Sequence, residues 1–103
     1  MRVVISRGNI SIRITEERLE HIYSGHPEMN NMQEEIVKTV ENPDIILKGD
    51  YGEKLACKLF DKSPVTFNKY LIAVYKEEGK EGFLITAYYA RKISERREVL
   101  WMH

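Results

Sequence analysis

The chain has 103 residues, of which 43% are hydrophobic and 31% charged, and this composition indicates one globular domain, not a disordered or collagen-like chain. Sixteen Lys and Arg residues balance sixteen Asp and Glu residues, so the overall charge does not require a polyanionic partner. The longest apolar run, Leu71 to Val74, is far shorter than the roughly 20 residues that span a bilayer. We therefore expect a single cytoplasmic domain over residues 1–103 with no membrane partner.

The N-terminal part predicts a β-hairpin followed by a helix. Residues 2–5 and 10–14 are apolar segments separated by turn-forming residues, and the second segment alternates with period two. Thr15 then occupies the N-cap position of a helix over about residues 16–24. Pro27 helps to end this helix, because the residue before a proline is disfavoured in helical geometry.

A second helix and four strands are predicted next. The helix begins at residue 31 or 32 and ends at residue 41, where the sequence Asn42-Pro43-Asp44 stops it. Segments rich in β-branched and aromatic residues then alternate with turn-like segments, one of which covers residues 61–68. The four predicted strands cover residues 45–47, 54–60, 70–75 and 83–89.

The connections between these strands are short, which favours antiparallel neighbours, because parallel neighbours need crossovers of about a dozen residues or more. The sequence therefore predicts an α+β fold: an N-terminal β-hairpin and two helices packed on a four-stranded antiparallel meander sheet. The tail from residue 91 to residue 103 is basic and then apolar, which predicts either a short helix or a final edge strand.

Three polar side chains within the predicted strands are candidates for contact with a ligand. Alternation puts Thr86 and Tyr88 on one strand face with Leu84, where two hydroxyls suit a phosphate or sugar oxygen. Ile85 belongs to the opposite face, which is the predicted core side. Lys58 can direct a cation across the sheet. Thr, Tyr and Lys are also common on solvated strand faces, so a purely structural role remains the alternative for all three.

Two histidines are candidates for proton transfer, because histidine donates and accepts protons near neutral pH. His26 follows the first predicted helix on its apolar stripe, which places it between helix and sheet. A half-buried histidine with a purely structural role is the alternative. His21 lies about 180° around the helix from Leu19 and is exposed on an isolated helix. Glu28 either orients an imidazole or caps the following turn. The spacing of the two histidines does not fit a metal pair on a helix.

The remaining reactive and charged residues have simpler interpretations. Cys57 is the single cysteine, and we interpret it as a small core residue. Arg91, Lys92, Arg96 and Arg97 form a basic cluster directly after the last predicted strand. This cluster is either a phosphate-facing patch or a solvated run of surface charges.

Three segments together carry a resemblance to a known family. They are residues 14–28, which end in His-x4-His-Pro-Glu, then Asn42-Pro43-Asp44, and then Ile85-Thr86-Ala87-Tyr88. With these motifs the chain resembles the phage-barnase-like nucleases, within the superfamily named for barnase, EndoU, the tRNase colicins and RelE. The resemblance covers about residues 10–101 and implies a helix followed by a four-stranded antiparallel meander.

The resemblance implies a metal-independent endoribonuclease of the toxin or phage-module kind that needs no cofactor. In such enzymes the ribose 2′-hydroxyl attacks the neighbouring phosphorus and leaves a 2′,3′-cyclic phosphate, which requires a base, an acid and cations. The implied partners are RNA, such as tRNA or mRNA, and an antitoxin or immunity protein. The implied catalytic residues are His21, His26, Thr86 and Tyr88, and the implied substrate-binding residues are Lys58, Arg91 and Lys92.

Two other classes of function stay open at this point. The first is a catalytically inactive nuclease-like module that binds RNA or a partner protein. The second is a small structural protein that forms a homodimer through an edge strand or through the tail at residues 99–101.

Overall fold

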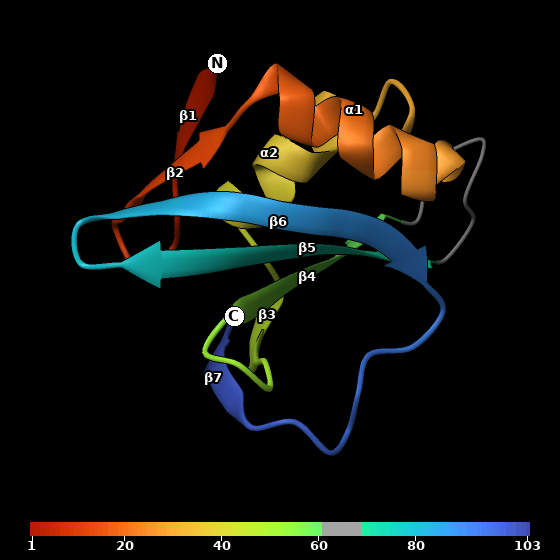
Figure 1. Cartoon of the computed structure of the whole chain (residues 1–103). Coiled ribbons are helices and arrows are strands. Elements are labelled where there is room, and N and C mark those ends of the chain that lie inside the picture. Colours follow the sequence, from red (N-terminus) through yellow and green to blue (C-terminus); the bar gives the residue numbers. More distant parts are fainter. Residues whose placement is uncertain (61–68) are drawn as a thin grey trace.

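A computed structural model describes residues 1–60 and 69–103, so the turn predicted at residues 61–68 lies outside the described part. Figure 1 shows the elements in chain order, coloured along the sequence. The elements are β1 (Arg2–Ile5), β2 (Ser11–Ile14), α1 (Glu16–Gly25), the short 3-10 helix η1 (Pro27–Met29), α2 (Gln33–Glu41), β3 (Ile45–Lys48), β4 (Lys54–Phe60), β5 (Lys69–Glu78), β6 (Glu81–Ala90) and β7 (Val99–Met102).

The strands form one seven-stranded mixed sheet in the order β1-β2-β6-β5-β4-β3-β7. The predicted α+β arrangement, with a four-stranded antiparallel meander beneath a separate hairpin and two helices, is therefore wrong. Strands β1 and β2 do pair with each other, but β2 also joins β6 in parallel, with Ser11 opposite Glu81 and Arg13 opposite Phe83. The tail forms β7, which adds to β3 at the other end of the sheet. Pairing between strands so far apart in the sequence leaves no local signal.

Local capping explains where the helices begin and end. The hydroxyl of Thr15 accepts a hydrogen bond from the backbone N–H of Arg18 at 3.0 Å, which fixes the start of α1 as the N-cap signal predicts. The second helix begins at Gln33, slightly later than expected, and its N-cap residue Met32 makes no side-chain capping bond. The helix ends where the backbone N–H of Asn42 donates to the carbonyl of Lys38 at 2.8 Å.

Both helices lie on the same side of the sheet (Figure 1), which we call the helix face. The main hydrophobic core lies here, because the apolar sides of α1 and α2 pack against inward side chains of β2, β4, β5 and β6. The core side chains from the helices include Leu19, Ile22, Ile36, Val37 and Val40, and those from the sheet include Ile12, Ile14, Leu71, Ala73, Tyr75, Leu84 and Ala87. No helix in the described part of the chain is both long and apolar enough to cross a membrane.

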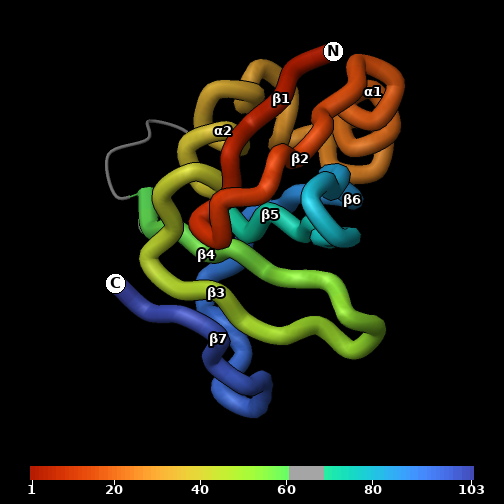
Figure 2. The backbone as a smooth tube through the Cα atoms, turned by 90° about the vertical axis from the view of Figure 1, so that its left-hand side faces the viewer, coloured from red at the N-terminus to blue at the C-terminus, as the bar shows by residue number. Residues whose placement is uncertain are grey.

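A second, smaller hydrophobic cluster lies on the opposite sheet surface, which we call the open face. It contains Leu47, Cys57 and Ile72, and Tyr88 packs against it. Ile93, from the chain segment between β6 and β7, covers part of this cluster. The segment 91–98 therefore passes next to the open face on its way to β7. Figures 1 and 2 both show β3 and β7 at the end of the sheet that is farthest from the helices.

Although β1 and β7 lie at opposite ends of the strand order, one side-chain contact links their neighbourhoods. The guanidinium of Arg7, in the turn between β1 and β2, lies 4.7 Å from the ring centroid of Trp101 in β7. A cation over an indole ring is attracted by the electron-rich ring face. The contact requires that the sheet curls enough to bring the β1–β2 turn to β7, and Figure 2 shows this curvature along the backbone.

A β-bulge changes which side chains of β6 face the core. Val74 of β5 lies opposite Thr86, but the next residue, Tyr75, lies opposite Leu84, so Ile85 is the extra residue. Leu84 consequently joins the core on the helix face, whereas Ile85 packs against the cluster on the open face. The predicted alternation, which groups Leu84 with Thr86 and places Ile85 in the opposite set, is wrong at this point.

Tyr75 is fully buried in the core, and its hydroxyl has no hydrogen-bond partner among the described residues. Burial raises the pKa of this phenol, and the charge of Glu77 adds to the effect. We expect Tyr75→Phe to keep or raise the free energy of unfolding, by up to about 1 kcal/mol, because the substitution removes an unsatisfied polar group. Urea denaturation measures this change. A loss of stability would show that the hydroxyl is bonded in solution.

Candidate active site

The candidate site lies along the edge of β6 next to α1. Strand β2 covers only the beginning of this edge, because its parallel pairing ends at Phe83. Beyond that point, no strand lies on this side of β6 in the described part of the chain, and α1 and η1 contact it instead. The guanidinium of Arg18 donates to the carbonyl of Ile85 at 3.3 Å and so satisfies one backbone group of the edge.

His26 and Tyr88 meet at this edge. Their ring centroids are 5.6 Å apart and the ring planes are inclined by 30°. His26 comes from the end of α1, where its backbone N–H donates to the carbonyl of Ile22 at 2.7 Å and holds the residue against the helix. The Nδ1 atom of His26 lies 3.6 Å from the Oε2 atom of Glu28, and 40% of the His26 side chain is exposed. The imidazole is therefore fixed on one side and reachable by solvent on the other.

The phenol of Tyr88 is kept in its protonated form. Burial raises its pKa and the neighbouring thiol of Cys57 adds to this effect, whereas the charge of Arg97 lowers the pKa. Cys57 itself is fully buried, and burial together with the charge of Asp44 raises the pKa of its thiol to about 12. At neutral pH, Tyr88 is thus a hydrogen-bond donor and Cys57 is a thiol, not a nucleophilic thiolate.

His21 lies one and a half helical turns before His26 and is exposed. Together with Thr15, Glu17 and Arg18 it lines a cavity of about 450 Å³ on the surface of α1. Arg18 links this cavity to β6, because the same guanidinium contacts the carbonyl of Ile85. Arg18 is therefore common to this cavity and to the edge where α1 meets β6.

Thr86 and Lys58 have different surroundings. Between Thr86 and Tyr88 the pairing with β5 is regular, so both side chains lie on the open face, and Thr86 is half-buried. Lys58 is not brought to Tyr88, because its neighbours Ala56 and Phe60 pack on the helix face. Its ammonium group donates to the carbonyl of Asn42 at 2.9 Å, so it binds the C-terminal end of α2.

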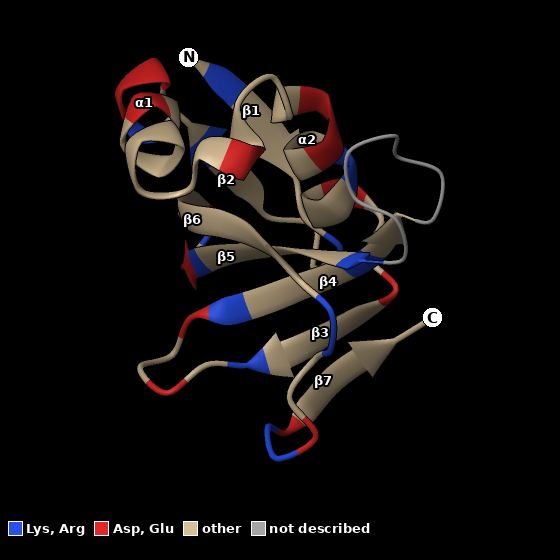
Figure 3. Cartoon of the chain, turned by 90° about the vertical axis from the view of Figure 1, so that its right-hand side faces the viewer, with Lys and Arg blue, Asp and Glu red and all other residues tan. Residues whose placement is uncertain are grey.

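The basic cluster is split between two places. Arg91 and Lys92 directly follow β6 and are exposed. Figure 3 shows basic and acidic stretches mixed in the chain between β6 and β7. Arg97, farther along, is mostly buried, and its guanidinium binds Asp50 with both terminal nitrogens, at 2.9 and 3.4 Å. Arg91 and Lys92 therefore extend the β6 end, whereas Arg97 belongs to a separate cavity.

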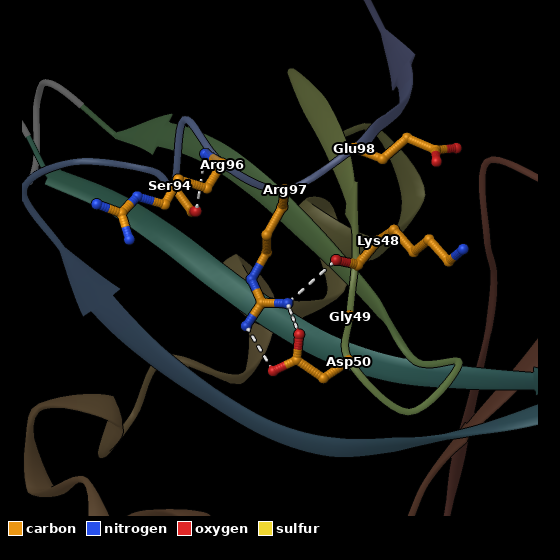
Figure 4. A pocket seen from close by; sticks show the side chains of 7 residues that line it. All are labelled: Lys48, Gly49, Asp50, Ser94, Arg96, Arg97 and Glu98. Atoms are coloured by element: carbon orange, nitrogen blue, oxygen red, sulfur yellow. Dashed lines mark hydrogen bonds and ion pairs between the residues drawn. The ribbon is translucent and has the colours of Figure 1, made fainter.

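This second cavity has a volume of about 420 Å³ and lies between the turn after β3 and the segment before β7. Figure 4 shows its lining residues, which are Lys48, Gly49, Asp50, Ser94, Arg96, Arg97 and Glu98. Sequence reasoning includes Arg96 and Arg97 in the basic cluster but misses Lys48 and Asp50, and it also misses Arg18. Nothing in the local pattern identifies them, because the cavity and the β6 edge are assembled from distant segments.

The described residues contain no group of three or more His, Cys, Asp or Glu side chains arranged to hold a metal ion. Neither protein-family models, nor known proteins, nor solved structures show a significant match to this chain.

Proposed function

We propose that the protein is a metal-independent endoribonuclease that cleaves RNA and leaves a 2′,3′-cyclic phosphate. The observation that carries the proposal is the contact of His26 with Tyr88, 5.6 Å between ring centroids, on a β6 edge that also holds Arg18. An exposed imidazole, a protonated phenol and a guanidinium supply the three kinds of group that the reaction needs.

The reaction is a transesterification at phosphorus. A base removes the proton of the ribose 2′-hydroxyl, and the 2′-oxygen forms a bond to the adjacent phosphorus. The bond from phosphorus to the 5′-oxygen of the next nucleotide breaks, and an acid protonates this oxygen. Cations and hydrogen-bond donors stabilise the additional negative charge that the phosphate oxygens carry in the transition state.

Within this proposal, His26 is the base, because its imidazole is exposed and has the Glu28 carboxylate beside its Nδ1 atom at 3.6 Å. The carboxylate orients the ring and stabilises the imidazolium that forms when the proton is taken up. His21 is the second proton-transfer group, because it lines the cavity that adjoins Arg18. Tyr88 donates its phenolic hydrogen to a phosphate oxygen, and Thr86 on the same strand face contacts the substrate next to it.

The cations that face the substrate differ in part from those implied by the resemblance. Lys58 is bound to the carbonyl of Asn42 on the helix face, so it stabilises the end of α2 and not the transition state. Arg18 takes this place, because its guanidinium already lies at the β6 edge. Arg91 and Lys92 are exposed at the end of β6 and bind phosphates on either side of the scissile one.

The test is an assay of the purified protein against total RNA and tRNA in the presence of EDTA. We expect cleavage without added metal ions, with products that end in 2′,3′-cyclic phosphates and in 5′-hydroxyls. Products that end in 5′-phosphates would contradict the proposal because they show that the 3′-oxygen leaves. Cleavage that EDTA abolishes would contradict it because it indicates a metal-dependent reaction.

Absence of cleavage in this assay would favour a different class of function. The net charge of zero then points to a non-catalytic module that binds RNA or a partner protein through the same edge. Retained RNA affinity in a double variant lacking both His21 and His26 would support such a module. An antitoxin or immunity partner stays a prediction that co-purification tests. A homodimer stays a prediction that sedimentation measurements test.

A further inference from the structure

The cavity between the turn after β3 and the segment before β7 has the donors of an anion site. Three cationic residues, Lys48, Arg96 and Arg97, line it together with the hydroxyl of Ser94. That hydroxyl already accepts a hydrogen bond from the backbone N–H of Arg96 at 3.3 Å, so its own hydrogen is free to bind an acceptor. In Figure 4 the ends of the Lys48 and Arg96 side chains extend away from Arg97 in opposite directions.

Arg97 is held ready for a ligand with two oxygens. One of its terminal nitrogens donates to the backbone carbonyl of Lys48 at 3.2 Å, which anchors the guanidinium in the cavity wall. The same nitrogen also donates to one carboxylate oxygen of Asp50 at 2.9 Å, and the second terminal nitrogen donates to the other carboxylate oxygen at 3.4 Å (Figure 4). A guanidinium binds a phosphate with the same paired geometry with which it binds a carboxylate. Asp50 thus occupies the position that a phosphate group would take.

The ion pair between Arg97 and Asp50 can be broken at little cost in stability. Because the Asp50 side chain is 70% exposed, water solvates its carboxylate when the ion pair breaks. Exposed ion pairs of this kind add little to stability. The Arg97 side chain is only 29% exposed and keeps its bond to the Lys48 carbonyl. A phosphate can therefore displace the carboxylate while the guanidinium stays in place.

We propose that this cavity binds the backbone phosphates of single-stranded RNA, and that Asp50 blocks Arg97 until a phosphate replaces it. Lys48 and Arg96 extend to either side of Arg97, an arrangement that suits successive phosphates along one strand better than a single free ion. The choice of RNA rests on the proposed function.

The experiment measures binding of a fluorescent oligoribonucleotide whose 2′-hydroxyls are all methylated, which cannot be cleaved by attack of a 2′-oxygen. We expect Asp50→Asn to raise the affinity for this probe by about two- to fivefold at low salt, because the substitution frees Arg97. Arg97→Ala is expected to lower the affinity about tenfold. It also reduces the slope of log affinity against log salt concentration by about 0.7, the value for one phosphate contact on a single strand.

The matched control is Glu95→Gln, which changes the net charge by the same amount in the segment that carries Arg97, at a residue that does not line the cavity. We expect this control to change the affinity less than Asp50→Asn does. In an Arg97→Ala background, Asp50→Asn is expected to have no further effect, because the guanidinium that it frees is gone. Equal gains for Asp50→Asn and Glu95→Gln, or a full gain for Asp50→Asn without Arg97, would overturn the proposal.

Failure of this inference and failure of the proposed function give different results. If the protein cleaves RNA but neither Asp50 nor Arg97 affects binding of the methylated probe, only the cavity assignment is wrong. If the expected pattern of affinities is found but no RNA is cleaved, the phosphate site stands and the catalytic proposal is wrong. Thermal unfolding of each variant, together with Arg97→Lys, separates loss of the phosphate contact from loss of the fold.

Discussion

Replacing His26 by alanine is expected to lower the rate of RNA cleavage by about two to four orders of magnitude, the usual contribution of a general acid or base. The imidazole is the proposed base, and its ring contacts Tyr88 with 5.6 Å between the ring centroids. Initial rates on a defined oligoribonucleotide measure the effect. The fold is expected to survive, because 40% of the His26 side chain is already exposed.

His103→Ala is the matched control for this variant. His103 follows β7 and contacts Trp101, with the ring centroids 6.1 Å apart, so it lies in a different part of the sheet. We expect this variant to keep full activity, and we expect His21→Ala to show a loss that identifies the second proton-transfer group. Full activity in His26→Ala, with unchanged pH dependence of the rate, would rule out the proposed role of this imidazole.

The largest expected effect on stability comes from Gly82→Ala. Gly82 lies where β2 joins β6, opposite Ile12 on one side and Glu77 on the other. A Cβ atom at this position would lie 2.2 Å from the backbone carbonyl oxygen of Lys76 and 2.7 Å from the Cδ1 atom of Ile12. The backbone contact cannot be relieved by rotating a side chain, so we expect the free energy of unfolding to fall by about 3 kcal/mol.

Gly25→Ala provides the control, since a Cβ atom on Gly25 would have no heavy atom within 4 Å. Alanine is also the better helix former, so this variant is expected to leave the free energy of unfolding unchanged or slightly higher. Urea denaturation of both variants measures the difference. Equal stability of the two variants would mean that β2 and β6 can move apart at Gly82 with no loss of stability. This result would contradict the close packing at Gly82.

Local signals predict the elements of this protein well. The side chain of Thr15 caps α1 as its position before the helix indicates, and the alternation of residues 54–60 matches the bounds of β4. These features depend on neighbours within about one helical turn or one strand, which the sequence lists side by side. Leu100 in β7 and Ile85 in β6 are the extra residues of two bulges, and a period-two pattern cannot place them.

The architecture of the sheet depends on pairings that no local pattern contains. Ser11 and Glu81 are opposite each other in β2 and β6, and every helix of the described chain lies between them in the sequence. The four-stranded prediction leaves the hairpin outside the sheet, because short connections indicate only which consecutive strands pair. Instead, β2 pairs with the beginning of the β6 edge and β7 pairs with the edge of β3.

The sequence identifies candidate residues one at a time, but it does not show how the fold arranges them. The sequence singles out His26 and Tyr88 for their chemistry, and the fold brings them into contact across more than half of the chain. The register places Lys58 and Tyr88 on different faces of the sheet. Lys58 lies opposite Leu71, which faces the helices, whereas Tyr88 lies opposite Ile72, which faces away from them. A register shift of one residue exchanges the two faces of a strand, so sequence alone cannot decide which cations meet the histidine.

The parallel pairing between β2 and β6 also determines when the nascent chain can complete its fold. The β1–β2 hairpin leaves the ribosome about 70 residues before its partner residues at Glu81–Phe83 do. At usual rates of synthesis this delay is on the order of several seconds, during which the inner edge of β2 stays unpaired. The helices can form in that interval, but the core under them cannot close until β6 emerges, so the protein gains its fold late and nearly all at once.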